Sequence, residues 1–358
     1  IPLVTGLLLV FLPAFVRKNI VDLVGTLAVA FPVVVAVVLG FSFSPDGSGY
    51  DFLSKTPLGL EAIGAQFHLG LNALSLPLFT LTAVVGLAAG VYTLGSKADR
   101  RGLFWGLILM ILGGTLGAFA SVDLFYGFLF HEIALLPTLI ALAVFGGANR
   151  RAVTIEVGLW LILGSLLMVV GLVLFYFKSG AHSFDIIALR EQLAGNSLSA
   201  EWHLPIWGFL IVGLCVIVGL WPFYSWVPKL LTTAPTAVAM LHVGALKMFG
   251  FYYLLQGFAG WIHLGILESR LVGTLMAIGA ILFMGMTALS QTDFKKLLSY
   301  STLMHVGTLV LGLLSYTYEA MAGLTVLMVG SGLAGAISFM AAGAIDRRVG
   351  SLEMTHLS

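Results

Sequence analysis

Apolar runs of about twenty residues recur along the whole sequence, and this is the length that one helix needs to cross a lipid bilayer. The 358 residues are 59% hydrophobic and 9% charged, whereas a soluble domain carries about 25% charged residues. No stretch between the runs is long enough to fold as a separate soluble domain. Because lipid offers the backbone no hydrogen-bond partners, apolar spans of this kind form helices. The sequence therefore predicts an all-α, polytopic membrane protein with a single transmembrane domain over residues 1–358.

Eleven spans are predicted, with a break inside the seventh. They cover residues 1–16, 20–41, 69–94, 102–120, 122–146, 153–177, 205–229, 233–258, 268–290, 294–314 and 318–345. The two longer loops are 42–68 and 178–204, and the amphipathic run FDIIALREQLAG in the second predicts a short surface helix. The chain opens at Ile1 inside an apolar run, without Met and without the basic flank of a signal peptide, so we expect it to be truncated at its start.

The distribution of positive charge gives these spans an orientation. Loops after odd-numbered spans hold twelve Lys and Arg residues, and loops after even-numbered spans hold four. Because Lys and Arg accumulate on the cytoplasmic side, we expect the N-terminus outside and the C-terminus of this chain on the cytoplasmic side. The net charge of +1 gives no reason to expect nucleic acid as a partner. The expected surrounding is the lipid bilayer.

The seventh and eighth spans form an apolar stretch that contains three closely spaced prolines, Pro222, Pro228 and Pro235. A proline removes a backbone donor and clashes with the preceding helical turn, so we predict an interrupted helix between residues 221 and 228. At membrane depth, the backbone groups that such a break frees are tolerated only where protein or a hydrated cavity covers them. A broken helix followed by a buried lysine is typical of ion-conducting membrane proteins.

Two ionisable side chains lie near the middle of their predicted spans, Glu132 in the fifth and Lys247 in the eighth. Because charge in hydrocarbon is costly, we expect both at mid-membrane depth, facing the protein interior and serving a function. Burial lowers the pKa of a lysine and a nearby carboxylate raises it, which suits a proton relay. The alternatives are a structural acid bonded to a neighbouring helix for Glu132, and an ammonium that reaches the membrane interface for Lys247.

Two histidines are further candidates, His242 in the eighth span and His305 in the tenth. A neutral imidazole both donates and accepts a hydrogen bond, so it can pass a proton. His305 follows the hydroxyl-rich run SYST, which can hold water, and this favours a functional role. For His242, a relay role and ordinary packing stay equally open.

Sequence features of cofactor and metal sites are absent. The single cysteine, Cys215, lies in an apolar run and supports neither a disulfide nor a metal site. The sequence has no phosphate-binding loop, no dinucleotide fingerprint and no Cys or His cluster with metal spacing. We therefore expect neither a cofactor nor a metal in this chain.

Four motifs, in order along the chain, resemble one family of membrane proteins. They are HLGLNALSL from His68, HEIALLP from His131, PFYSWVP from Pro222 with APT and Lys247 downstream, and TDFKKLLSYSTLMHVG from Thr292. These motifs resemble elements of the antiporter-like subunits of proton-pumping NADH:quinone oxidoreductase (respiratory complex I) and its relatives. The HEIALLP run is most similar to subunit M. Subunits L and N, multisubunit sodium/proton antiporters and membrane-bound hydrogenases share the same core.

The resemblance implies an antiporter-like fold with two inverted five-helix repeats, in which the broken seventh helix lines a half-channel. It implies that Glu132, Lys247 and His305 carry protons, while partner subunits hold NADH, FMN, iron–sulfur clusters and quinone. The expected partners are the L-, N- and K-type membrane subunits of the same complex, and the expected location is the bacterial inner (plasma) membrane. Because the chain ends before the family's twelfth helix, truncation is expected at this end too.

Two positions depart from the family pattern. The family's lysine in the broken helix is Ile217 here, and its eleventh-helix histidine is Ser331. We predict that His242 carries the proton that the missing lysine would have governed. Two other functions stay open. The chain could instead belong to a cation/proton antiporter or a membrane-bound hydrogenase. It could also be a non-conducting scaffold with a decayed relay, an interpretation that Ile217 favours.

Overall fold

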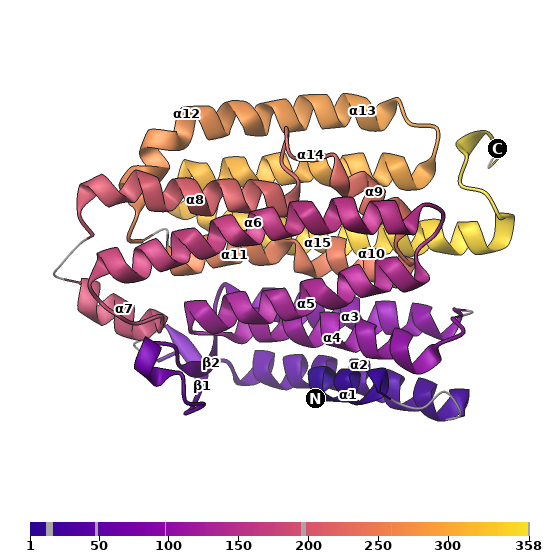
Figure 1. Ribbon diagram of the computed structural model, residues 1–358, viewed down its shortest axis with the longest axis horizontal. Helices are drawn as coiled ribbons and strands as arrows, with labels where there is room; N and C mark the ends of the chain where they lie inside the picture. The colour runs from indigo at the N-terminus through magenta and orange to yellow at the C-terminus, as the bar shows by residue number, and fades with distance from the viewer. Residues whose placement is uncertain (12–16, 47–48, 97, 195–197, 259, 357–358) are drawn as a thin grey trace.

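Long helices lie side by side and nearly parallel, and a small β-hairpin and one short helix gather at one end of the bundle (Figure 1). The computed structural model describes residues 1–11, 17–46, 49–96, 98–194, 198–258 and 260–356. Within this part of the chain, ten helical segments are long and apolar enough to cross a membrane. The end of the bundle that carries the β-hairpin is called the hairpin end below.

The elements share the bundle axis except for the short pieces at its ends. In chain order they are α1 (Pro2–Val10), α2 (Lys18–Ser42), β1 (Tyr50–Thr56), η1 (Glu61–Ile63), β2 (Phe67–Asn72), α3 (Ser75–Leu94), α4 (Arg101–Ala120), α5 (Leu124–Phe145), α6 (Arg150–Ser179), α7 (Ile186–Leu193), α8 (Ala200–Val218), α9 (Trp226–Thr233), α10 (Thr236–Leu241), η2 (His242–Leu246), α11 (Met248–Gly257), α12 (His263–Gly279), η3 (Ala280–Met284), α13 (Gly285–Leu289), α14 (Phe294–Ser315), α15 (Tyr318–Val349) and η4 (Met354–His356).

Two predicted spans differ from the helices found. The first, 1–16, corresponds to α1 over Pro2–Val10, and residues 12–16 lie outside the described residues. The third, expected from residue 69, begins at Ser75. The reason is that the preceding residues form β2, which pairs antiparallel with β1. The surface helix predicted within 178–204 is α7.

The outward faces of several helices are apolar. Leu27 of α2, Leu159 of α6 and Leu271 of α12 are 62%, 65% and 71% exposed. Water would make such faces an association hazard, whereas hydrocarbon solvates them at no cost. The α12–α13 segment lies along one edge of the bundle, and α1 and α2 lie along the opposite edge (Figure 1). The surface chemistry therefore fits a bundle surrounded by lipid.

The predicted break in the seventh span is confirmed, and it begins slightly earlier than expected. Helix α8 ends at Val218, because Gly219 adopts a left-handed conformation with φ +71 that glycine takes without steric cost. Helix α9 starts at Trp226, and Pro228 falls in its first turn, where a missing N–H leaves no helical bond unmade. The Trp226 indole donates to the carbonyl of Val216 at 3.1 Å, which satisfies one acceptor that the break frees.

Candidate functional site

The predicted relay lysine lies deep inside the bundle. Lys247 is the twelfth residue of the 22-residue span Thr236–Gly257, and its side chain is only 6% exposed. Among the described residues, no hydrogen bond or ion pair reaches its ammonium. The prediction that Lys247 faces the interior is confirmed, and the snorkelling alternative is excluded because no membrane interface is within its reach.

A π-helical turn, η2, directly precedes Lys247. The backbone N–H of Lys247 donates to the carbonyl of His242, five residues earlier, at 3.1 Å. A π-turn inside an α-helix is rare and is frequent at functional sites. The π-turn widens the helix, and His242 and Lys247 lie at its two ends. No sequence pattern used above predicts this turn.

The imidazole of His242 is buried beside the broken helix. Its ring meets the Trp226 ring edge-on, at 5.9 Å between centroids and 86° between planes. Its Nδ1 atom is buried and bonds to no described residue. The charge of Lys247 acts on both His242 and His305, and His131 acts on His242. These side chains therefore form one electrostatically connected group.

His131 joins the fifth helix to this group, a role that the sequence did not predict. Its ring stacks on Phe249 of α11, at 4.5 Å between centroids and 16° between planes. Its Nδ1 lies 3.4 Å from a Glu132 carboxylate oxygen, within ion-pair distance but without hydrogen-bond geometry. The only sequence signal was its place beside Glu132 in the motif at residues 131–137. We call His131, Glu132, His242, Lys247 and His305 the mid-membrane group.

Glu132 differs from its predicted orientation. Successive helical residues point about 100° apart, so His131 takes the interior face of α5 and Glu132 turns toward α6. There Ser165 donates to its carboxylate at 2.7 Å. The Glu132 side chain is 31% exposed and lines a largely apolar groove of about 570 Å³ along α5 and α6. The prediction that Glu132 faces the protein interior is therefore wrong for this chain.

The position of the missing family lysine is informative. Ile217 is 4% exposed and packs against Gly164 of α6, whose absent Cβ leaves room for the isoleucine. Ser165, the residue after Gly164, donates to Glu132. Position 217 thus faces the turn of α6 that holds the carboxylate, and Ile217 makes an apolar contact there. Ser331, the other departure, lies buried in α15.

The remaining site residues lie on the other side of Lys247. His305 is half-buried at the twelfth position of the span Phe294–Ser315. Tyr300, one turn earlier, faces Tyr224 from the break, with ring centroids 6.4 Å apart. Near the end of the bundle opposite the hairpin, Lys229 of α9 pairs with Glu156 of α6 at 2.6 Å.

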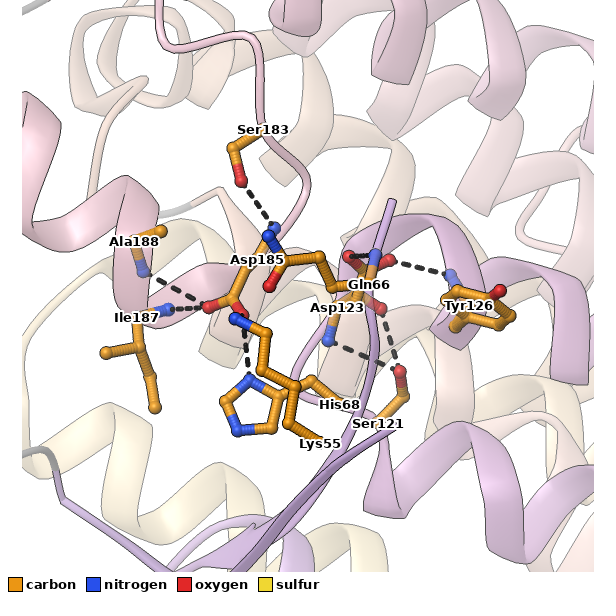
Figure 2. A network of polar contacts seen from close by, with 10 residues as sticks. All are labelled: Lys55, Gln66, His68, Ser121, Asp123, Tyr126, Ser183, Asp185, Ile187 and Ala188. Atoms are coloured by element: carbon orange, nitrogen blue, oxygen red, sulfur yellow. Dashed lines mark hydrogen bonds and ion pairs between the residues drawn. The ribbon is translucent and has the colours of Figure 1, made fainter. Parts of the chain in front are cut away.

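A second polar cluster, which the sequence did not predict, lies at the hairpin end (Figure 2). The His68 ring bonds to the Asp185 carboxylate at 2.7 Å, and Lys55 approaches the same oxygen at 3.6 Å. Asp185 caps α7, and Asp123 caps α5. An isolated β-bridge joins Asp123 to Asp185. We call this cluster the hairpin-end network: Lys55, Gln66, His68, Ser121, Asp123, Tyr126, Ser183 and Asp185.

The two aspartates of the network respond to burial differently. Burial raises the pKa of Asp123 to about 7, although the backbone N–H groups of Gln66 and Tyr126 partly oppose the shift. Burial also acts on Asp185, but its hydrogen bond from His68 and nearby backbone donors outweigh it, so its pKa lies below the usual value. Asp123 therefore exchanges a proton near neutral pH, whereas Asp185 stays charged.

The arrangement suits proton transfer more than electron transfer or metal chemistry. The described residues contain no group of three or more His, Cys, Asp or Glu side chains placed to hold a metal ion. They do place titratable groups on four helical segments within electrostatic range of one another. Each of these groups can hold or release a proton as its neighbours change charge.

Known proteins are similar to this chain along most of its length. Residues 121–358 match the family described as NADH:quinone oxidoreductase/Mrp antiporter, TM. NADH-quinone oxidoreductase subunit M of Rickettsia felis is 27% identical over 312 residues, which are 87% of this chain and 62% of that relative. This chain therefore spans about three fifths of the length of that relative.

Solved structures share the fold. A chain of respiratory complex I from Thermus thermophilus superposes with a TM-score of 0.86 at 26% identity, over 98% of this chain and 71% of that one. A chain of the Mrp complex from Dietzia superposes with a TM-score of 0.82 at 19% identity, over 98% of this chain and 64% of that one, and shows a shared fold alone. By the match over most of its length, this integral membrane chain belongs to the NADH:quinone oxidoreductase/Mrp antiporter transmembrane family.

Proposed function

We propose that this chain is a proton-translocating membrane subunit of a complex I-type NADH:quinone oxidoreductase. In this role it couples quinone reduction in partner subunits to proton movement through Glu132, His242, Lys247 and His305. The family match, the subunit M relative and the complex I structure support the proposal.

The observation that carries this proposal is the buried, unpaired ammonium of Lys247. A charge without a partner in a low-dielectric interior is costly, so whether the group holds its proton depends on the charges around it. A neighbouring charge that arrives or leaves moves this balance. Lys247 has such neighbours on both sides, His242 on its own helix and His305 on α14. The pair Glu132–His131 extends the group to α5.

The multisubunit complexes among the similar solved structures support the proposed setting. Partner membrane subunits of the L-, N- and K-type would flank the chain, and NADH, FMN, iron–sulfur clusters and quinone would reside in partner subunits. The charge bias of the loops places the N-terminus outside and the C-terminus of this chain in the cytoplasm. The hairpin end is then the outer end, and the proposed location is the bacterial inner membrane.

The test compares pumping with electron transfer in the assembled complex. In reconstituted vesicles, Lys247→Ala should lower the number of protons moved per electron while quinone reduction continues, because the electron path lies in other subunits. Lys296→Ala is the matched control, since Lys296 is an exposed lysine at the start of α14. An unchanged proton-to-electron ratio in Lys247→Ala would reject the relay.

One observation favours a second candidate, a non-conducting scaffold. Ile217 replaces the family lysine with a side chain that cannot hold charge, and it is packed tightly against α6. If the scaffold is correct, every variant of the mid-membrane group will leave pumping unchanged while the complex still assembles. A cation/proton antiporter without a redox partner would instead move protons against a cation gradient in the absence of quinone.

A further inference from the structure

A groove lies between α5 and α6, which are neighbouring helices of the bundle (Figure 1). Its volume is about 570 Å³, which falls in the range of sites for small organic molecules. Leu129, Val173 and Phe177, which line it, are 39%, 41% and 62% exposed, so the groove opens on the outer surface of the bundle. A small molecule in the bilayer therefore has access to it.

The helical repeat of α5 and α6 builds the groove. Phe125, Phe128, Leu129 and Glu132 line it from α5, at the three- and four-residue spacing of one helix face. The lining residues of α6 fall between 169 and 177 with the same spacing. Among the described residues that line the groove, only Glu132 is charged. A single carboxylate thus lies in an otherwise largely apolar groove.

Aromatic rings fix the end of the groove nearer the hairpin. The rings of Tyr176 and Phe184 stack at 4.6 Å between centroids and 21° between planes, and Phe125 packs against Phe184 at 5.9 Å between centroids. These contacts hold the rings in place before a ligand binds, so binding orders few side chains. Aromatic faces also attract a nearby cation. This wall suits a ligand that is both apolar and positively charged.

The Glu132 carboxylate has one oxygen free for a ligand. Both of its contacts are made by Oε1, which accepts from Ser165 at 2.7 Å and lies 3.4 Å from Nδ1 of His131. Oε2 bonds to no residue that the structure describes. An ionised carboxylate has about four acceptor positions over its two oxygens, so Oε2 offers a strong acceptor inside the groove.

Charge decides which kind of molecule fits this acceptor. A carboxylate at membrane depth is costly unless it is paired. The acyl chain of a lipid would fill the apolar part of the groove but would leave Oε2 without a partner. A lipid phosphate would be repelled, because like charges disfavour each other. A protonated amine, in contrast, pairs with the carboxylate and donates a hydrogen bond to it.

We propose that this groove is a binding site for lipophilic amines, with the ammonium on Oε2 of Glu132 and the apolar body against Phe125, Phe128 and Tyr176. Phe125 and Glu132 are seven residues apart, or about 10.5 Å along the helix axis, a distance that suits a molecule with two aromatic rings. A bound ammonium holds Glu132 in its charged form, so the carboxylate no longer exchanges protons. This effect on pumping rests on the proposed proton-translocating function, whereas the binding itself does not.

The test measures saturable binding of two matched probes to the assembled complex in lipid nanodiscs. Diphenylethylamine carries the ammonium, and diphenylethanol has nearly the same shape without the charge. We expect the amine to bind the wild-type complex about tenfold more tightly than the alcohol, because a hydrogen bond to a charged group contributes more than a neutral one. Equal binding of the two probes would show a groove that takes any apolar molecule. Saturable binding of neither probe would show that a partner or a lipid fills the groove, and either result overturns the proposal.

Three variants locate the bound amine. Glu132→Gln keeps the size of the side chain and an acceptor for Ser165 but removes the charge, so the two probes should bind it equally. Val173→Trp fills the groove from a position that is 41% exposed, so it should bind neither probe. Glu156→Gln is the matched control, because this partly exposed glutamate of α6 does not line the groove, and it should bind the amine as wild type does. Tight amine binding that survives in Glu132→Gln would place the amine elsewhere and overturn the proposal.

A second measurement separates the site from the proposed function. In vesicles, the amine should lower the protons moved per electron by the wild-type complex, whereas in Val173→Trp it should cause no such fall. Because amines also collapse proton gradients by themselves, the comparison with Val173→Trp isolates the effect of the bound molecule. Saturable binding that depends on Glu132 but leaves pumping unchanged would support the site and contradict the role of Glu132 in the relay. A fall of equal size in wild type and Val173→Trp would contradict inhibition through this groove.

Discussion

The mid-membrane group and the hairpin-end network both bury ionisable side chains. They differ in whether these side chains have hydrogen-bond partners. Asp185 at the hairpin end accepts from His68 and from two backbone N–H groups. In the middle of the bundle, the ammonium of Lys247 and Nδ1 of His242 bond to no described residue. Unpaired buried charge is expensive and persists where a protein uses it. We propose that the paired charges fasten the hairpin end and that the unpaired ones serve transport.

The largest effect is expected from His242. If His242 carries the proton that the missing lysine would have governed, as we propose, His242→Leu should lower protons moved per electron nearly as much as Lys247→Ala. Adding Ile217→Lys should restore part of the loss, since position 217 packs against the turn of α6 that bonds Glu132. Normal pumping by His242→Leu in vesicles would show that this histidine is not part of the proton path.

The hairpin end should respond through stability instead. Asp185→Asn keeps the cap of α7 but loses the ion pair with His68 and Lys55. Breaking a buried pair costs about 3–5 kcal/mol, so thermal unfolding in detergent should shift strongly downward, while Asp99→Asn, at an exposed position, should not shift it. A variant as stable as wild type would show that the network does not hold the hairpin end.

The stability that Asp185→Asn loses depends on pH in a definite direction. Burial acts to raise the pKa of Asp185, but the His68 hydrogen bond, the Ala188 backbone N–H and the nearby His68 and Lys55 side chains together hold it below its usual value. Its stabilisation is therefore present above the unfolded pKa of about 3.9 and is lost as the pH falls through the lower folded value. The stability difference between wild type and Asp185→Asn should shrink in acid.

The smallest effect is expected from the ion pair between Lys229 and Glu156. The side chains are 49% and 34% exposed, and solvent-screened pairs contribute less than about 1 kcal/mol. Lys229→Met, Glu156→Gln and the double variant should therefore unfold close to wild type, with a small coupling energy in the cycle. A coupling energy of several kcal/mol would show that this exposed pair contributes to stability as strongly as the buried hairpin-end network.

The sequence predicted the parts of the fold that depend on local chemistry. Pro222 and Pro228 predicted the break, and an ionisable side chain in the middle of an apolar span singled out Glu132 and Lys247. It did not predict the π-turn at 242–246, because the residues of this turn do not differ in type from those of an ordinary α-helix. It also missed the role of His131, because adjacency to Glu132 does not reveal which of the two side chains faces inward.

The hairpin-end network could not be predicted for a different reason. His68 and Asp185 are 117 residues apart, and four membrane-spanning helices lie between them in the sequence. Neither residue carries a local pattern that names its partner.

The division between unpaired and paired charge is tested most directly by measuring two quantities on the same preparations. Protons moved per electron and the midpoint of thermal unfolding are recorded for Lys247→Ala and Asp185→Asn. We predict that Lys247→Ala lowers pumping per electron and unfolds at or above the wild-type midpoint, whereas Asp185→Asn unfolds earlier and keeps its pumping ratio. A Lys247→Ala complex that pumps normally but unfolds early would contradict the central claim.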